Sequence, residues 1–518
     1  MHIELALVGL FVVATGVAMV ARRLKTPYTV ALVVAGLMLG TATDFEPIHL
    51  TKELLYAVFL PGLLFEAAFA LEFKNFWANK LAISSLALPG VIAAIALTTL
   101  LLVPVANGLH FVDSFTLADG FIFAAVIAAT DPIAVVALFK SLGAPKRLAV
   151  LVEGESLLND GTAVVLFTIV LGVAMGGEFS LSAAVLEFIK VVGMGIVIGG
   201  AVGYAVSLVI KEVDDPMIEI TLTTIAAYGS FVFAEYFHFS GVIATVVAGM
   251  LCGNYAARVG MSPSTRVAVG TFWEYLAFAL NSLVFLLIGF EVRVGALLAA
   301  WKPIVIAYLA VTLGRALVMA VVGALLSRTR EKLSWRWVSV LTWGGLRGSL
   351  SMVLVLGLPL ALPHRDLIIT MTFGVVILSI LIQGLTMGPL LRVMKLVGAR
   401  PAEGEYDRLK GQLRGAAAAL EEIKRMEHEG AVSAPVAEDL RAQFEARQVT
   451  ARSAIGELHL KAEDLVVEER RSALRRALSA EKDAVHQERH AGRISAESQE
   501  ALLADIDARL VNVQLEHE

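Results

Sequence analysis

Charged residues are scarce in this sequence. Asp, Glu, Lys and Arg make up 17% of the 518 residues and hydrophobic residues 57%, whereas soluble domains carry about 25% charged residues. The scarcity is confined to the first part of the chain. Up to about residue 395, apolar runs of about 20 residues follow one another, each long enough to cross a bilayer as a helix. This part is therefore excluded as a soluble domain, and a polytopic membrane protein is indicated.

Several chemical functions are also excluded by what is missing. Cys252 is the only cysteine, so no disulfide framework forms within one chain. No cluster of Cys and His is present to suit zinc or copper, and no phosphate-binding motif indicates an ATP-driven pump. Ser156 follows Gly154, but Leu158 stands where a hydrolase nucleophile elbow needs a second glycine. We therefore expect neither an enzyme nor a bound cofactor.

The apolar runs predict about thirteen spanning helices. Basic residues gather in the loops after odd-numbered spans, such as Lys140, Lys146 and Arg147 after the fifth. Because basic loops favour the cytoplasmic side, the N-terminus should lie outside and the C-terminal part in the cytoplasm. Thirteen spans also allow two inverted six-helix repeats, joined by the seventh span. The approximate limits are 3–21, 27–42, 52–71, 81–106, 117–139, 149–175, 183–210, 217–237, 240–257, 268–290, 297–326, 336–360 and 366–391.

A few ionisable residues stand inside these spans, where each is costly and calls for a reason. Arg315 either pairs locally or reaches toward an interface, and no role is assigned to it. The sixth span carries a hydroxyl and a carboxylate one helical turn apart, Ser156 and Asp160. These hard oxygen ligands suit a hard cation. The ionisable residues are Glu66 in the third span, Asp131 in the fifth, Glu155 and Asp160 in the sixth, Arg315 in the eleventh and Arg347 in the twelfth.

Two spans are interrupted at matching positions of the two halves. Pro132 breaks the fifth span, because its ring clashes with the preceding turn and it donates no hydrogen bond. Three glycines in the segment 344–348 loosen the twelfth span. Broken helices at equivalent places in inverted halves indicate a transporter site. Next to the first break, Asp131 either contacts a cation or caps the helix that restarts there.

These residues resemble the motifs of a known family. The segments 130–132 (Thr-Asp-Pro) and 155–161 (Glu-Ser-Leu-Leu-Asn-Asp-Gly) resemble the paired signature of the monovalent cation:proton antiporter-1 family, the sodium/proton exchangers. The segment 344–349 resembles its third motif, and the segment 59–69 its third-span motif. Gly62 departs from many relatives, which have a second proline there. The resemblance covers the membrane part in order and spacing.

The resemblance implies a homodimer in which Asp160 of each subunit binds either a cation or a proton. Thr130 and Ser156 would help to hold the cation. Glu66 would contribute directly or through water, or merely line the cavity. An asparagine before the aspartate, rather than a second aspartate, resembles the branch with electroneutral one-for-one exchange.

The resemblance also assigns supporting roles. Asp131 and Asn159 would line and stabilise the crossing of the broken helices beside Pro132. Glu155 would pair with Arg347 as a structural ion pair.

The sequence thus predicts a secondary active antiporter in the plasma membrane. It would exchange Na⁺ or Li⁺ for H⁺ by alternating access, with cation and proton competing for Asp160. A K⁺/H⁺ antiporter of the same architecture is the main alternative. A cation channel is disfavoured, because a selectivity pore needs rings of ligands around an axis. Residues 1–396 would form the membrane domain and 397–518 a helical cytoplasmic tail, which is either a solubilising appendage or a regulatory or dimer-supporting domain.

Two details of the tail are also predicted. Gly430, Pro435 and Gly456 should interrupt its helices, because glycine and proline weaken helix interiors. Ser495 should cap a later helix.

Overall fold

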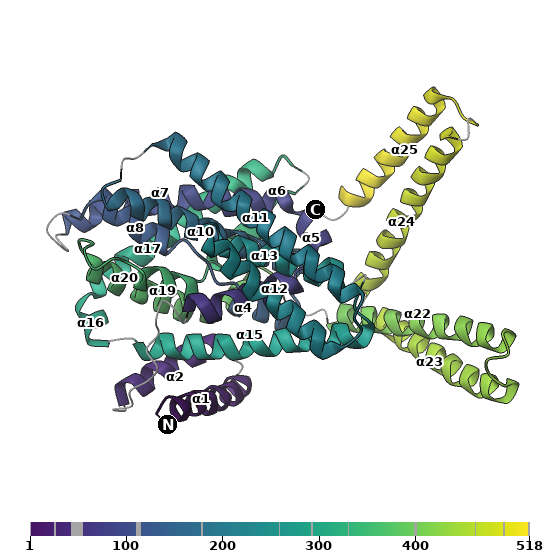
Figure 1. Cartoon of the computed structure of the whole chain (residues 1–518). Helices are drawn as coiled ribbons and strands as arrows, with labels where there is room; N and C mark the ends of the chain where they lie inside the picture. The colour runs from purple at the N-terminus through teal and green to yellow at the C-terminus, as the bar shows by residue number, and fades with distance from the viewer. Residues whose placement is uncertain are drawn as a thin grey trace. The chain divides into compact units, whose positions relative to one another are not determined.

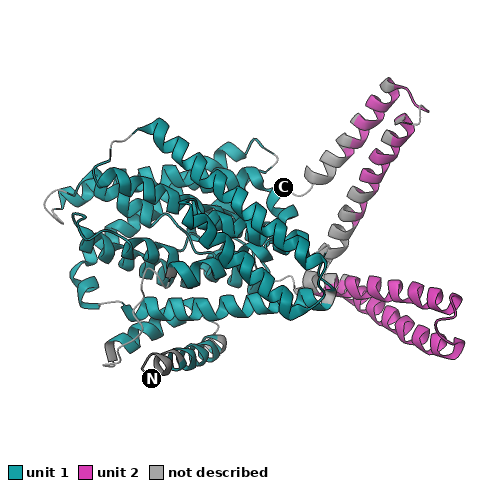
Figure 2. Cartoon of the chain, viewed as in Figure 1, with its two compact units in different colours: residues 1–397 teal, residues 398–518 magenta. Residues whose placement is uncertain are grey.

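The structure is a computed structural model. In it the chain forms two compact units, Met1–Val397 and Gly398–Glu518 (Figure 2). All regular secondary structure of the described residues is helical, which confirms the predicted fold class. The predicted start of the third span, 52–54, lies outside the described residues. The structure describes residues 2–24, 27–42, 55–109, 115–177, 180–257, 260–291, 294–329, 331–397, 401–461, 463–490 and 493–515.

The first unit is a bundle of apolar helices (Figure 1). Among the described residues, seven continuous helical segments are long and apolar enough to cross a membrane, and the other apolar helices are shorter. Short helices that follow one another directly, or that are separated only by an interruption as α8 and α9 are, together form one span. The count along the described chain is then about thirteen, as predicted. In order, the elements are α1 (His2–Leu24), α2 (Tyr28–Ala42), η1 (Leu55–Phe59), α4 (Leu60–Ala70), α5 (Phe73–Ala78), α6 (Lys80–Ser85), η2 (Leu86–Gly90), α7 (Val91–Gly108), α8 (Leu117–Val126), α9 (Ile133–Leu142), α10 (Lys146–Ala174), α11 (Leu181–Lys211), α12 (Pro216–Tyr236), α13 (Gly241–Leu251), η3 (Cys252–Ala256), α15 (Pro263–Glu291), α16 (Val294–Ala299), α17 (Trp301–Leu326), α18 (Trp335–Trp343), α19 (Ser349–Leu356), α20 (Arg365–Leu378), η4 (Ser379–Gln383) and α21 (Gly384–Val393).

Local sequence explains where the fifth span starts, breaks and restarts. Thr116 and Asp119 form a reciprocal capping box at the start of α8, which satisfies amides that the first turn leaves free. After Val126 the chain leaves the helix, and α9 begins directly after Pro132. Proline favours an extended residue before it and is tolerated at a helix start. The span is therefore two half-helices joined by a non-helical segment, 127–132.

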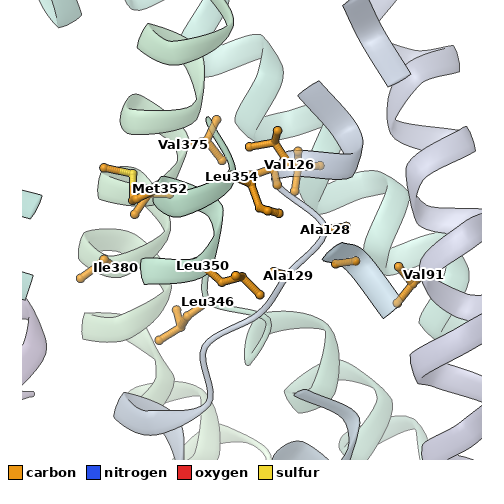
Figure 3. Close-up of a cluster of buried hydrophobic side chains, with 14 of the residues drawn as sticks. Val91, Val126, Ala128, Ala129, Leu346, Leu350, Met352, Leu354, Val375 and Ile380 are labelled. Carbon is orange, nitrogen blue, oxygen red and sulfur yellow. The ribbon is translucent and has the colours of Figure 1, made fainter. Parts of the chain in front are cut away.

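The two interrupted spans cross each other in opposite directions. The first half of one, α8, packs against the second half of the other, α19, while α9 and α18 both pack against α21. Where they cross, the amide of Asp131 donates to the carbonyl of Leu346 over 2.8 Å. Figure 3 shows Ala128 and Ala129 on the non-helical segment beside Leu346 and Leu350. Such an antiparallel crossing is the relation expected of equivalent helices in inverted repeats.

The helices of the first unit form two groups. The crossing group comprises α6 to α10 with η2 and α17 to α21, and the scaffold group comprises α1, α2, α4, α11 to α13 and α15. Within the scaffold group α2 runs along α15 (Figure 1). A methyl group at Gly36 or Gly289 would overlap backbone atoms of the facing helix, so glycine is required for this close approach. The groups meet mainly along α10, which contacts α4, α11 and α13.

The second unit consists of helical hairpins. The first pairs α22 (Pro401–His428) with α23 (Ala434–Lys461), and the second pairs α24 (Glu463–His490) with α25 (Ala496–Leu515). Gly430 lies in the turn between α22 and α23 and has a φ of +71°. The helix break predicted there is therefore confirmed. Ser495 accepts from the amide of Ser498 over 3.0 Å, which confirms it as a cap. The break predicted at Gly456 is wrong, because that residue lies inside α23.

Candidate cation-binding site

The break in the fifth span leaves backbone carbonyls without helical partners, and Arg347 satisfies them. Its Nη1 donates to the carbonyls of Ala128, over 2.8 Å, and Ala129, over 3.3 Å. Asn159 on α10 adds a bond from Nδ2 to the Ala128 carbonyl over 3.1 Å. A cation at this position also opposes the partial negative charge at the end of α8. Arg347, which comes from the other interrupted span, therefore holds the crossing together.

The break in the twelfth span is held by a second arginine. Arg315 on α17 donates to the carbonyl of Leu341 from Nε, over 3.2 Å, and from Nη2, over 2.9 Å. The same guanidinium forms two parallel bonds of 3.0 Å with the carboxylate of Glu155 on α10. Both partners are buried, with exposed fractions of 8% for Arg315 and 2% for Glu155. This fork-to-fork geometry is the strongest form of such a pair.

The expected pair between Glu155 and Arg347 is therefore corrected. Glu155 pairs with Arg315, to which the sequence assigned no role. The guanidinium of Arg347 is instead directed at the carbonyls of the broken fifth span. Each arginine donates hydrogen bonds to backbone carbonyls at the end of a different half-helix. The spacing of residues in the sequence does not distinguish these pairings, because both arginines lie in spans that face the core.

Asp131 stands one residue before the N-cap position of α9, which is Pro132. Its Oδ1 accepts from the amide of Ile133, over 2.9 Å, at the start of α9, which favours the capping alternative for this oxygen. Gly348 lies directly against the carboxylate. A methyl group at Gly348 would stand 2.5 Å from Oδ2 of Asp131, so only glycine fits here.

Next to the crossing lies a cavity of about 70 Å³, between α4, the non-helical segment 127–132, α10, α15 and α19. A buried water needs about 10–15 Å³ of such space, so a cation with some water fits. The cavity brings together all five residues that the sequence proposes as cation ligands. They are Glu66, Thr130, Asp131, Ser156 and Asp160.

Asp160 is the group in this cavity that most needs a partner. Its Oδ1 is buried and has no hydrogen-bond partner among the described residues. By contrast, the Ser156 hydroxyl donates to the Thr130 carbonyl, and Thr130 Oγ1 accepts from Asn159 over 3.1 Å. These bonds fix two hydroxyl oxygens beside the carboxylate. A buried carboxylate oxygen without a donor is stabilised by a proton or a cation.

Two further residues of the cavity were not identified from the sequence. Glu153 precedes Ser156 by three residues and Asp160 by seven, so the three share one face of α10. Glu153 could therefore have been predicted from the sequence as a residue of the site. Asn281 on α15 also lines the cavity, and its Oδ1 is buried without a partner in the described part of the chain. Asn281 stands in no recognisable motif, so only the fold brings it to the site.

Cavities of different size lie next to the site and beyond the crossing. A wider cavity of about 790 Å³ shares Ile133 with the small one and extends between α1, α2, α9, α15 and α21. Ser141 and Arg392, near the loops after odd-numbered spans, line its far end. Beyond the crossing there is a pocket of only about 20 Å³, lined by Glu155, Arg315 and Arg347. The wider cavity therefore adjoins the site on the side that carries the basic loops.

The chain is similar to known membrane proteins over most of its length. The family model described as "Sodium/hydrogen exchanger, transmembrane" matches residues 8–393. The Na(+)/H(+) antiporter ApNhaP of Aphanothece halophytica is 39% identical over 387 residues, 74% of this chain and 73% of that protein. The Na(+)/H(+) antiporter NhaH of Halobacillus dabanensis is 37% identical over 402 residues, 75% and 97% of the two chains.

A solved structure shares the fold. The sodium proton antiporter MjNhaP1 from Methanocaldococcus jannaschii at pH 8 matches with a TM-score of 0.62 and 20% sequence identity. The match covers 77% of this chain and 100% of that one. The family match ends at residue 393, so the second unit lies outside it.

Proposed function

The chain belongs to the sodium/hydrogen exchanger family, and from this premise we propose that it exchanges Na⁺ or Li⁺ for H⁺ at Asp160. The observation that carries the proposal is the buried Oδ1 of Asp160, which has no protein partner among the described residues and faces a cavity shared with Thr130 and Ser156. Because one carboxylate serves both ions, each displaces the other. Competition for a single group couples the two fluxes.

The proposed exchange is electroneutral. Asp160 is preceded by Asn159, whose amide is already bonded to Ala128 and Thr130. One carboxylate that carries either one proton or one monovalent cation moves the same charge in both directions. Hydroxyl oxygens of Thr130 and Ser156 would complete the cation's coordination, as hard ligands do. Glu66 would contribute directly or through water.

Alternating access would move the crossing group past the scaffold group. The half-helices are held to each other by Arg315 and Arg347, which favours rigid-body motion of the crossing as one piece. In the described part of the chain, α10 makes the broadest contact with the scaffold, while α19 contacts α15 and η4 contacts α2 over smaller areas. The wide cavity would face the cytoplasm, with the N-terminus outside.

Further parts of the proposal come from the family and the sequence. The protein would be a homodimer in the plasma membrane, needing no cofactor besides the transported Na⁺ and H⁺. The helical hairpins of the second unit would form a cytoplasmic tail, either regulatory or supporting the dimer.

The test is proton flux into proteoliposomes that contain a pH-sensitive dye. Sodium or lithium should change the dye signal equally with and without a voltage clamp. Asp160→Asn should abolish the signal, while Asp366→Asn, whose side chain is 98% exposed at the start of α20, should leave it intact. A response to potassium alone would replace the sodium proposal with K⁺/H⁺ exchange. A clamp-driven cation flux without proton movement would indicate a channel.

A further inference from the structure

A second cavity lies behind the cation site. Its volume is about 900 Å³, within the range of about 300–1,000 Å³ typical of sites for small organic molecules. On α10 it is lined by Leu158 and Thr162, each two residues beyond a residue of the cation cavity, Ser156 and Asp160. Two helical residues correspond to about 200° of rotation. The cavity and the cation site therefore lie on opposite faces of one helix.

The walls of this cavity are apolar and open toward the bilayer. They come from the segment α5 to η2 on one side and from α11 and α13 on the other. Several lining side chains are exposed, including Trp77 at 53%, Ile196 at 49% and Leu88 at 39%. Such a surface holds no water, because water needs polar partners. Left unfilled, the lining atoms lose their dispersion contacts. In a membrane, hydrocarbon chains are the molecules at hand to fill it.

One end of the cavity has the character of a membrane interface. Phe73 and Trp77 stack there with ring centroids 5.6 Å apart, and Tyr255 lines the same end. The Nζ of Lys80 lies 4.0 Å from the centre of the Trp77 ring, and Lys74 lines the cavity itself. Aromatic rings with lysines mark the level of lipid headgroups. Lysines at this level attract anionic lipids.

We propose that this cavity binds an acyl chain of an anionic phospholipid, whose headgroup contacts Lys74 and Lys80. A second copy of the chain is the competing occupant. It would cover two lysines that are exposed in this structure, and burying charge without a partner is costly. A lipid keeps both ammonium groups at the water interface, with its phosphate as counter-charge.

This site would regulate exchange, a consequence that rests on the proposed function. The cavity lies beside the contact that α10 of the crossing group makes with α11 and α13 of the scaffold group. An acyl chain there fills the interface that changes during alternating access. The lipid would therefore support the movement by keeping this interface packed in both states.

The test measures lipid binding and transport separately on the full chain. Native mass spectrometry counts phosphatidylglycerol and phosphatidylcholine retained after delipidation. Ile196→Trp and Leu88→Trp should each fill the cavity and lose the retained phosphatidylglycerol. Val197→Trp is the matched control, because Val197 is 59% exposed on the same helix and does not line the cavity. It should retain the lipid.

The lysines are tested through lipid preference. Lys74→Gln should reduce the preference for phosphatidylglycerol over phosphatidylcholine about fivefold, the effect of one lysine near an anionic surface. Lys211→Gln, an exposed lysine at the end of α11 outside the cavity lining, should not. Equal retention by both tryptophan variants and their control would overturn the proposal. So would conversion of Ile196→Trp to a monomer with unchanged lipid, which would assign the cavity to a second copy. If neither the unmodified chain nor any variant shows proton flux, while the unmodified chain still retains the lipid, the exchange function is refuted and the lipid site is not.

Discussion

Replacing Arg315 by methionine should destabilise the protein strongly. The change keeps much of the side-chain volume but removes the guanidinium, so the Glu155 carboxylate loses two 3.0 Å bonds. Both residues are buried, and removing one partner of a buried pair costs about 3–5 kcal/mol. The carbonyl of Leu341 loses two further bonds. Arg315→Lys keeps the charge but not the fork and should recover only part of the loss.

The assay is a double-mutant cycle on the free energy of unfolding in mixed detergent micelles. Glu155→Gln is combined with Arg315→Met in one cycle and with Arg347→Met in the other. We expect a coupling energy of about 2–3 kcal/mol with Arg315 and below about 1 kcal/mol with Arg347. Circular dichroism before unfolding verifies that each variant retains its helices.

The two cycles distinguish the pair in the structure from the pair that the family motif suggests. Coupling of Glu155 mainly to Arg347, with Arg315 nearly independent, would refute the reasoning. It would mean that the carbonyls of Ala128 and Ala129 are not the main partners of Arg347.

Three further outcomes follow from the site. Gly348→Ala should push the Asp131 carboxylate off the start of α9. Because overpacking costs about 1–3 kcal/mol of folding stability, we expect a lower free energy of unfolding, with slower proton flux. Gly200→Ala, with open space around it, should leave both unchanged. Because proton and cation compete for Asp160, the sodium concentration for half-maximal flux should rise on acidification, approaching roughly tenfold per pH unit. If that sodium concentration does not change with pH, the two ions bind at separate sites. Truncation after Val397, at the division between the two units, should leave an inserted protein that still exchanges ions in proteoliposomes, and a truncated protein that fails to fold would show that the second unit supports the first.

Much of the fold can be predicted because the membrane imposes simple rules on the sequence. A span must be apolar over a fixed length, so the limits of α11 and α17 could be placed to within about four residues. Interruptions can be predicted from residues that cannot continue a helix, such as Pro132. The segment 127–132 leaves the helix where expected. Ligands four residues apart on one helix, such as Ser156 and Asp160, must share a face.

The rest depends on contacts between spans, which the membrane rules do not encode. Two buried arginines and one buried glutamate allow two pairings, and only the crossing geometry assigns Glu155 to Arg315. Asn281 reaches the cavity because α15 packs against α4 and α19. The error at Gly456 is of another kind. Glycine in a helix costs about 1 kcal/mol relative to alanine, which good helix formers and packing against a neighbouring helix can offset.

The distribution of charge at the crossing suggests why only a loaded site would move. At the crossing, the guanidinium of Arg315 is paired with the Glu155 carboxylate, and the guanidinium of Arg347 is bonded to backbone carbonyls. Asp160 lines its cavity together with the carboxyl groups of Glu66, Asp131 and Glu153. A proton or a monovalent cation on Asp160 removes one negative charge from this acidic group, and with neither the Asp160 carboxylate adds its own charge to it. Moving an unpaired charge through an apolar barrier is costly, so the empty, ionised site should be held back while either loaded form passes. Strict coupling then needs no separate gate, because the same imbalance that attracts the ion also prevents movement without it.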